Sequence, residues 1–325
     1  MAAKQEDKPP LLALVGPTAT GKSDLALVVA QQIKAEIICA DSAQIYRRLD
    51  IGTAKPTARE QGLAPHHLFD LVDPDCSFSA ASYQKAATAA IDAIQQRGRL
   101  PILVGGTGLY FQTVTDAYAF GSEGKDQNVR DHLYREAEEK GLQTLYRQLT
   151  ENDPAAAVKI HPNDRRRIIR ALEFITMEGR PISEQVIQTK KNDQPYNLIV
   201  FGLSMPRPEL YRRIEKRVDQ MLQRGFLEEV KALLKAGYAP GCPGLNILGY
   251  RQLTAYLSGE MGWEETVEEI KKQTRRLAKR QMTWFRRDPR IIWLEIKDKE
   301  ELSAPAEIIC RQVKEKLAVQ ANNII

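Results

Sequence analysis

The chain has 325 residues, 43% of them hydrophobic, which is enough for one large domain or two modest ones with an apolar core. No apolar run approaches the roughly 20 residues that a membrane span requires, so we expect no membrane partner. The four cysteines are scattered without a C-x-x-C pair, which argues against a zinc site or a disulfide framework and favours a cytoplasmic location. The net charge is only +5, but its basic residues gather in two segments.

The first motif in the chain predicts a phosphate site. Leu11–Val15 is typical of a short buried strand, and a helix is expected to begin at Ser23. The residues between them match the phosphate-loop pattern G-x-x-x-x-G-K-[ST]. A loop of this kind turns backbone N–H groups toward an anion at the positive end of a helix. We therefore predict that a di- or triphosphate is bound by Gly16, Pro17, Thr18, Ala19, Thr20, Gly21, Lys22 and Ser23, with the Ser23 hydroxyl placed to ligate Mg²⁺.

Two further strands end in polar loops. Residues 35–40 are expected to form a strand that ends at Asp41, and residues 100–104 a strand that ends in Gly-Gly-Thr at 105–107. A helical run near 82–96 separates them. Strands alternating with helices indicate a parallel α/β sheet, whose ligands lie at the carboxyl ends of the strands. Asp41 is then beside the phosphates, as a metal ligand, a general base or a turn aspartate.

From about Phe120 the pattern changes to long polar, helix-favouring stretches. No comparable strand follows until residues 197–202, so we predict a helical insertion domain over 117–196 within a core made of 11–116 and 197–325. Inside the insertion, Asp164 is expected to cap an arginine-rich helix that ends at Gly179. After it, a long helix begins near Pro208 and is interrupted at Gly225.

The last long helix is expected to run from about Glu264 to Asp288. Nine Lys or Arg residues lie between Lys271 and Arg290, against a single acid. Ile270, Leu277 and Trp284 recur every seven residues and are predicted to form its buried seam. Two arginine-dense helices far apart in the sequence favour a polyanionic partner, and nucleic acid in particular.

The chain from about Leu11 to Leu294 resembles the bacterial tRNA dimethylallyltransferases. The resemblance lies in seven ordered motifs: GPTATGKS at 16–23, DSAQIY at 41–46, DIGTAKP at 50–56, LVGGTGLY at 103–110, HPNDRRRIIRALE at 161–173, LGYRQ at 248–252 and RRLAKRQMTWFRR at 275–287. It implies a P-loop-type parallel sheet with a helical insertion and long C-terminal helices. It also implies a prenyl transfer from dimethylallyl diphosphate to N6 of adenosine 37, next to the anticodon of tRNA, with Mg²⁺ as cofactor. We expect a cytoplasmic monomer whose macromolecular partner is the anticodon stem-loop of tRNA.

The resemblance also suggests roles for individual residues. Asp41 would accept the proton from the adenine amine, and Thr107 would position that amine. Lys22 and Arg217 would neutralise the departing diphosphate, which the loop at 16–23 holds. Contacts with tRNA are expected from Asp41, Ser42, Ala43, Gln44, Thr107, Arg166, Arg167, Ile168, Ile169, Arg170, Gly249, Tyr250, Arg251, Gln252, Arg276, Lys279 and Arg280.

Three other functions share part of this pattern. A P-loop small-molecule kinase fits the first 110 residues but needs neither basic cluster. An RNA-binding ATPase would need a second acid at a strand end, and the strand at 100–104 has none. An adenylate isopentenyltransferase acting on free AMP would share the chemistry but would not need an extended RNA surface.

Overall fold

The computed structural model describes residues 8–116, 118, 120, 127–185, 194–296 and 302–322. Within the chain there are two compact units, one made of Met1–Val114 with Pro195–Ile325 and the other of Thr115–Gln194. The insertion predicted from the sequence spans 117–196. Some of its residues (117, 119, 121–126 and 186–193) lie outside the described part.

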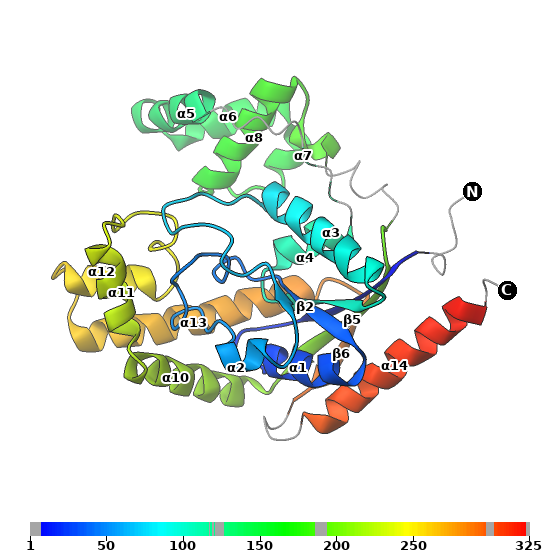
Figure 1. The fold of residues 1–325 in the computed structure, drawn as a ribbon. Coiled ribbons are helices and arrows are strands. Elements are labelled where there is room, and N and C mark those ends of the chain that lie inside the picture. Colours follow the sequence, from blue (N-terminus) through cyan, green and yellow to red (C-terminus); the bar gives the residue numbers. More distant parts are fainter. Residues whose placement is uncertain are drawn as a thin grey trace. The chain divides into compact units, whose positions relative to one another are not determined.

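The larger unit is built on a six-stranded sheet with the strand order β3-β2-β4-β1-β5-β6, in which all neighbouring strands are parallel (Figure 1). This confirms the predicted parallel α/β core. Four of the strands were expected, whereas the two edge strands were not, because one has only two residues and the other follows directly on the basic helix. The strands are β1 (Pro10–Val15), β2 (Ala35–Cys39), β3 (His66–His67), β4 (Leu100–Gly105), β5 (Asn197–Ser204) and β6 (Ile291–Glu295).

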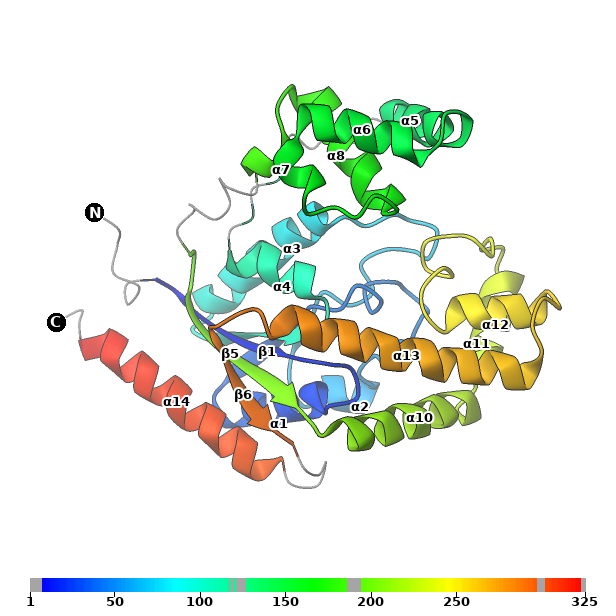
Figure 2. The same ribbon diagram turned by 180° about the vertical axis from the view of Figure 1, so that it is seen from behind.

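Helices cover both faces of this sheet, which is why its central strands are apolar on both sides. Along β1, Leu11 and Ala13 belong to one buried cluster, while Leu12 and Leu14 belong to another that includes residues of the first and last helices. Figures 1 and 2 show these layers. The helices of this unit are α1 (Lys22–Gln32), α2 (Ala58–Gln61), α3 (Ala80–Gln96), α4 (Gly108–Thr115), α10 (Arg207–Gln223), α11 (Phe226–Lys235), α12 (Tyr250–Leu257), α13 (Trp263–Phe285) and α14 (Ser303–Asn322).

The predicted break at Gly225 separates α10 from α11. Gly225 has φ 97°, a left-handed conformation that glycine adopts without strain, and it is the N-cap of α11. This turn brings α11 and α12 into the same unit as the sheet, with α13 running beside α10 (Figure 2).

The predicted seam of α13 is wrong in part. Ile270 is buried, but the other buried apolar residues are Ala278 and Phe285, and Trp284 is exposed. Seven residues fall about 20° short of two helical turns, so successive steps of seven drift around a straight helix. Two such steps carry Trp284 to the edge of the buried face.

The smaller unit is a helical domain with its own core. Leu145, Leu149 and Ile168 are fully buried in it. The predicted cap is confirmed, because the Asp164 side chain accepts the Arg167 N–H and Gly179 ends the helix in a left-handed conformation. Its helices are α5 (Gln127–Glu139), α6 (Leu142–Asn152), α7 (Pro154–Ala157) and α8 (Arg165–Glu178).

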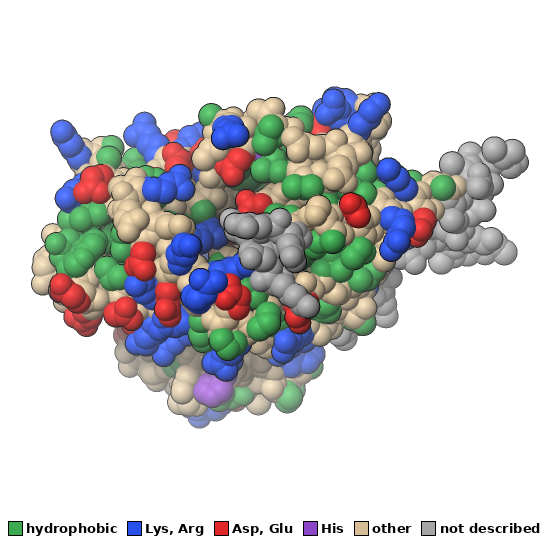
Figure 3. Space-filling view, turned by 90° about the horizontal axis from the view of Figure 1, so that it is seen from below, with side chains coloured by type: hydrophobic (Ala, Val, Ile, Leu, Met, Phe, Trp, Pro, Cys, Tyr) green, Lys and Arg blue, Asp and Glu red, His purple; other side chains and the backbone are tan. Residues whose placement is uncertain are grey.

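Surface charge is mixed rather than uniformly basic on one face of the protein. Acidic side chains lie among the basic ones on the face seen in Figure 3. On α10, for example, Glu209 pairs with Arg212 at 2.7 Å and with Arg213 at 3.0 Å. In the part of the chain that the structure describes, no helix has the length and apolarity needed to cross a membrane.

Candidate active site

The phosphate loop lies between β1, the inner strand flanked by β4 and β5, and the first turn of α1. Gly16 has φ 132°, and a Cβ at this position would lie 2.6 Å from the Leu203 carbonyl oxygen on β5. Gly21, the N-cap of α1, has φ 90°. Both glycines are therefore needed for the loop to pass close to β5 and enter the helix, which directs the N-terminus of α1 at the loop.

Lys22 is held inside this loop. Its Nζ donates to the Pro17 carbonyl at 2.5 Å, and the Thr20 hydroxyl donates to the same oxygen at 2.9 Å. Burial lowers the pKa of Lys22 to about 7; nearby Asp41 opposes this shift and Arg217 adds to it. An anion in the loop would therefore draw a proton onto Lys22.

Asp41 and Thr107 meet because β2 and β4 are neighbours in the sheet. The Thr107 N–H donates to the Ala40 carbonyl at 3.1 Å, and the Ser42 N–H donates to the Thr107 hydroxyl at 3.0 Å. Asp41 Oδ1 accepts the Ala43 N–H at 2.9 Å, so this side chain does shape a turn. That hydrogen bond engages only one of the two carboxylate oxygens, so it is compatible with a second role.

Arg217, on α10, lies within electrostatic range of Asp41 and Asp24. Burial lowers the pKa of Arg217, while the two carboxylates raise it. Three charged groups from separate parts of the sequence, Lys22, Asp41 and Arg217, are thus brought together at the carboxyl edge of the sheet.

Gln281, which the sequence reasoning missed, ties this edge together from α13. Its Oε1 accepts the Thr18 N–H at 2.8 Å, and its Nε2 donates to the Gly106 carbonyl at 3.1 Å. One amide of the phosphate loop is therefore satisfied by a side chain 263 residues away. The available signal was a polar residue on the buried side of the helix, between Ala278 and Phe285.

The two glycines that flank Thr107 make room for α13. A Cβ on Gly106 would lie 2.2 Å from Gln281 Nε2, and a Cβ on Gly108 would lie 2.2 Å from Trp284 Cδ1. Gln281 and Trp284 are three residues apart and so lie on one side of the helix. The glycines at 106 and 108 are explained by this close approach, which holds the Thr107 turn against α13.

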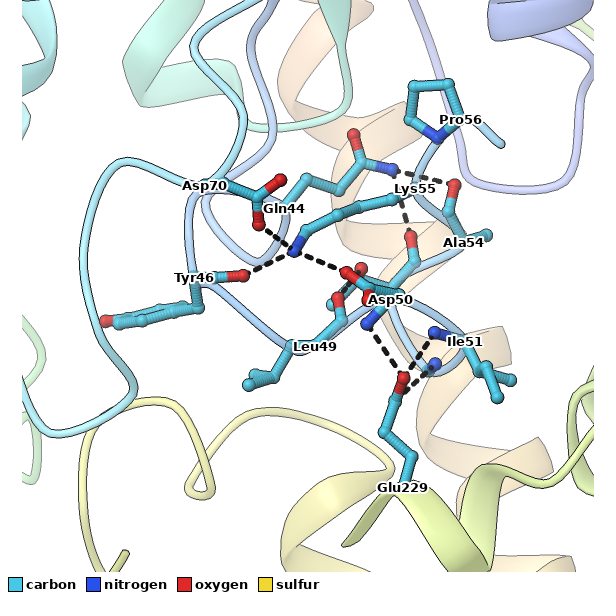
Figure 4. A network of polar contacts seen from close by, with 12 residues as sticks. Gln44, Tyr46, Leu49, Asp50, Ile51, Ala54, Lys55, Pro56, Asp70 and Glu229 are labelled. Carbon is cyan, nitrogen blue, oxygen red and sulfur yellow. Dashed lines mark hydrogen bonds and ion pairs between the residues drawn. The ribbon is translucent and has the colours of Figure 1, made fainter. Parts of the chain in front are cut away.

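A second polar network holds the loop that follows Asp41 (Figure 4). Lys55 Nζ pairs with Asp50 at 2.8 Å and with Asp70 at 2.6 Å, although its side chain is only 4% exposed. Gln44 Nε2 donates to the carbonyls of Thr53 and Ala54 at 2.9 and 3.1 Å. The two hydrogen bonds from Gln44 join the DSAQIY motif to the DIGTAKP motif.

The same loop is anchored to α11 by Glu229. Its carboxylate accepts three backbone N–H groups, from Asp50 at 2.9 Å, Ile51 at 2.8 Å and Gly52 at 3.1 Å (Figure 4). It also accepts a hydrogen bond from the Tyr250 hydroxyl at 2.5 Å. Burial and Glu229 together raise the pKa of Tyr250, so its hydroxyl remains a donor. Glu229 therefore replaces four hydrogen bonds that water would otherwise supply.

We expect Glu229→Gln to destabilise the protein by about 3 kcal/mol. The amide NH₂ must face either the Asp50 and Ile51 N–H groups or the Gly52 N–H and the hydroxyl of buried Tyr250. Those donors are then unpaired, at a cost of about 1–3 kcal/mol for each one that is shielded from water. Urea unfolding measures this cost. The matched control is Glu228→Gln, because Glu228 is exposed and pairs with Lys231 at 3.7 Å, and its cost should stay below about 0.5 kcal/mol. Equal effects of the two changes would contradict the anchoring role.

The residues near the loop include few metal ligands of protein origin. Among the described residues, no group of three or more His, Cys, Asp or Glu side chains could hold a metal ion. The exposed Ser23 hydroxyl, in the first turn of α1, is an oxygen donor of the kind that Mg²⁺ prefers. This donor set fits an ion that takes most of its remaining ligands from a bound diphosphate and water.

The sequence profile of the IPP transferase family matches residues 44–288. The chain belongs to this family. A tRNA dimethylallyltransferase from Moorella thermoacetica is 52% identical over 314 residues, covering 94% of this chain and 97% of that protein. One from Pelotomaculum thermopropionicum is 47% identical over 309 residues, covering 95% and 98% of the two chains.

Solved structures agree with this assignment. The full-length tRNA isopentenylpyrophosphate transferase of Bacillus halodurans is 40% identical with a TM-score of 0.71, covering 97% of this chain and 100% of that chain. A eukaryotic dimethylallyltransferase acting on tRNA is 28% identical with a TM-score of 0.82, covering 96% of this chain and 80% of that one. The P-loop-type fold predicted for an IPP transferase is therefore confirmed.

In this IPP transferase, four of the residues predicted to contact tRNA have buried side chains. Ile168 and Ile169 are buried in the core of the smaller unit. Tyr250 is fully buried and donates to Glu229, while Gln252 is buried and accepts the Gly249 N–H at 2.8 Å. In the LGYRQ motif only Arg251 is exposed, because the rest caps α12 and packs against α11.

The arginines and lysines that were predicted to contact tRNA from the two basic helices are exposed. On α8, Arg166, Arg167 and Arg170 face outward, although Arg170 also pairs with buried Glu173 at 3.1 Å. On α13, Arg276, Lys279 and Arg280 are exposed. The charges that could meet a polyanion are therefore at the surface of both units.

Proposed function

We propose that this protein transfers the dimethylallyl group from dimethylallyl diphosphate to N6 of adenosine 37 in tRNA and releases diphosphate. The observation that carries the proposal is the arrangement beside the phosphate loop. There, the carboxylate of Asp41 follows β2 and the hydroxyl of Thr107 follows β4. An ATPase would need an acid after β4, in the place of Thr107. Membership of the IPP transferase family supports the prenyl donor.

The chemistry requires two kinds of help from the protein. The exocyclic amine of adenine is a weak nucleophile, because its lone pair is delocalised into the ring. As N6 forms a bond to the allylic carbon, the carbon–oxygen bond to diphosphate breaks and that oxygen keeps the electron pair. Asp41 takes the proton lost from N6, and the Thr107 hydroxyl orients the amine.

The leaving group is stabilised by positive charge on Arg217 and on Lys22, which takes up its proton as the diphosphate binds. Lys22 and Arg217 both interact electrostatically with Asp41, and together with the amides at the start of α1 they would bind the diphosphate. Mg²⁺, held by the Ser23 hydroxyl and the diphosphate, would neutralise further charge on the leaving group. No water needs to be activated, which agrees with the lack of an acid after β4.

The anticodon stem-loop of tRNA is the proposed acceptor. Exposed arginines on α8 and α13 suit phosphates, whereas free AMP would need no such surface. A base stacked in the anticodon loop must be extruded to reach Asp41. Ser42 and Arg251, both exposed, are further candidates for RNA contacts. We propose that the enzyme acts as a monomer in the cytoplasm, where the free thiols of its four cysteines are stable.

Incubation with labelled dimethylallyl diphosphate tests this function directly. We expect label to enter a tRNA that has adenosine at position 37, but neither AMP nor a tRNA with guanosine there. Label in AMP alone would indicate an adenylate isopentenyltransferase. ATP hydrolysis that is stimulated by RNA and abolished by Lys22→Ala would overturn the proposal.

Proton uptake is expected when the diphosphate binds. In the protein without a ligand, the pKa of Lys22 is about 7, and a bound anion should raise this pKa. Below pH 7 the amine is already charged, so affinity should not depend on it; above pH 7 the affinity should fall by up to about tenfold per pH unit. At pH 8, calorimetry in buffers of different ionisation enthalpy should detect uptake of close to one proton.

Lys22→Arg is the matched control for this proton. Arginine stays charged throughout this pH range, so its proton uptake should be lower than that of the wild type by the Lys22 contribution. The titration of the diphosphate itself is common to both proteins and cancels. Identical uptake in the two proteins would show that Lys22 is charged before the ligand arrives.

A further inference from the structure

Trp284 was expected in the buried seam of α13, yet its side chain lies at the surface. It is 41% exposed, and Leu109, at the start of α4, is 40% exposed. The two residues belong to segments that meet at Gly108, since a Cβ there would lie 2.2 Å from the Trp284 ring. A large apolar ring with a contact on one side and solvent on the other is poorly explained by core packing.

The position of this ring is close to the proposed reaction. Gly108 follows Thr107, whose hydroxyl accepts the Ser42 N–H at 3.0 Å. On α13, Gln281 lies about one turn before Trp284 and contacts both the phosphate loop and Gly106. The indole is thus seated one residue from Thr107, at the edge of the sheet where Asp41 also lies.

Trp284 also lies in a row of arginines on α13. Arg276, Arg280 and Trp284 follow one another at intervals of four residues, Arg287 lies in the turn just after the helix, and all four are exposed. Residues at these spacings share one face of a helix. Aromatic rings beside guanidinium groups suit single-stranded nucleic acid, because the rings stack on bases while the arginines contact phosphates.

We propose that Trp284, which lies against Gly108, stacks on a nucleobase of the tRNA anticodon loop while the target adenine is presented to Thr107 and Asp41. The inference rests on the proposed function and adds a base-stacking surface to it. The ligand chemistry is the flat π-face of a base. That base is either the extruded adenine or one of its neighbours in the loop.

Binding of a 17-nucleotide anticodon stem-loop to three variants tests this surface. Trp284→Leu keeps an apolar contact on Gly108 but loses the π-face, and should weaken binding by about 5- to 100-fold. Trp284→Phe should recover most of the affinity. The control is Trp263→Leu, since Trp263 is at the other end of the same helix and packs on Tyr256 at 5.2 Å. Its affinity for the stem-loop should change less than twofold.

The binding of dimethylallyl diphosphate separates stacking from two other roles. Its KM should be unchanged in Trp284→Leu if the ring contacts RNA alone. A raised KM for dimethylallyl diphosphate with normal stem-loop affinity would mean that the indole contacts the prenyl chain, and would overturn the proposal. So would equal losses for both substrates, which would show that Trp284 only supports the Thr107 turn.

Fluorescence identifies the base. The chain has three tryptophans, so Trp263→Phe with Trp293→Phe leaves Trp284 as the reporter. We expect the stem-loop to quench it. With 2-aminopurine at position 37 or at either neighbour, quenching of the analogue at one position will distinguish the extruded base from a flanking one. No change in Trp284 emission at saturating stem-loop would refute the stacking. If the stem-loop binds and quenches Trp284 emission but the wild-type protein transfers no prenyl group, the proposed function fails while the stacking surface stands.

Discussion

Asp41→Asn is expected to lower the turnover of prenyl transfer by about 10²- to 10⁴-fold, the range typical of a lost general base. Asparagine retains the shape of the side chain, and its oxygen can still accept the Ala43 N–H that Asp41 Oδ1 accepts at 2.9 Å. Only the ability to take a proton is lost. Affinities for tRNA and for dimethylallyl diphosphate should therefore change little. Single-turnover transfer at saturating substrates measures the effect.

Two controls separate a base from the other roles open to Asp41. Asp41→Ala also removes the turn hydrogen bond, and should cost about 1 kcal/mol of stability that Asp41→Asn does not. If Asp41 chiefly held Mg²⁺, the Asn variant would bind diphosphate weakly and extra Mg²⁺ would restore part of the rate. A near-normal rate for Asp41→Asn would rule out the proposed mechanism.

Replacing Arg276, Lys279 and Arg280 together by alanine should weaken tRNA binding on the order of 10²-fold, if each side chain's hydrogen bond to a phosphate is worth about 1 kcal/mol. Because neutralising a phosphate releases counterions, the slope of log K against log salt should become shallower by about 0.7–0.9 for each phosphate that the variant leaves unneutralised. Binding of dimethylallyl diphosphate should be unaffected. Filter binding of tRNA at several salt concentrations measures both quantities.

The same helix offers a matched control with the same reduction in charge. Lys271 pairs with Asp219 at 2.8 Å, Lys272 with Glu269 at 2.9 Å and Arg275 with Glu215 at 2.6 Å. Alanine at these three positions should change the salt slope much less, because their charges already have partners within the protein. Equal slopes for the two triple variants would mean that α13 acts only through its net charge.

Much of the candidate site could be predicted from short segments. The phosphate loop, the end of β2 at Asp41 and the turn at Thr107 each follow an apolar run. In a parallel sheet such ends meet at one edge. We could therefore predict that these three segments lie close together, although they are far apart in the sequence.

Several of the residues predicted to contact RNA have buried side chains, and burial depends on packing partners elsewhere in the chain. Tyr250 and Gln252 lie in a motif with an exposed arginine between them, and nothing local distinguishes the three. Tyr250 is buried because Phe226 packs on its ring, with centroids 4.8 Å apart, and because Glu229 accepts a hydrogen bond from its hydroxyl. Both partners are on α11.

By itself, the sequence determined the features that depend on a few neighbouring residues: the phosphate loop with its two glycines, the Asp164 cap and the break at Gly225. Backbone conformation and capping hydrogen bonds are settled within about one turn of chain, so local residue types are sufficient to predict them. Only the tertiary structure decided that Gln281 would accept the Thr18 N–H, that Glu229 would hold residues 50–52, and that Trp284 would be exposed against Gly108. Each of these outcomes joins side chains to segments more than 170 residues away, and such contacts exist only once the helices have packed on the sheet.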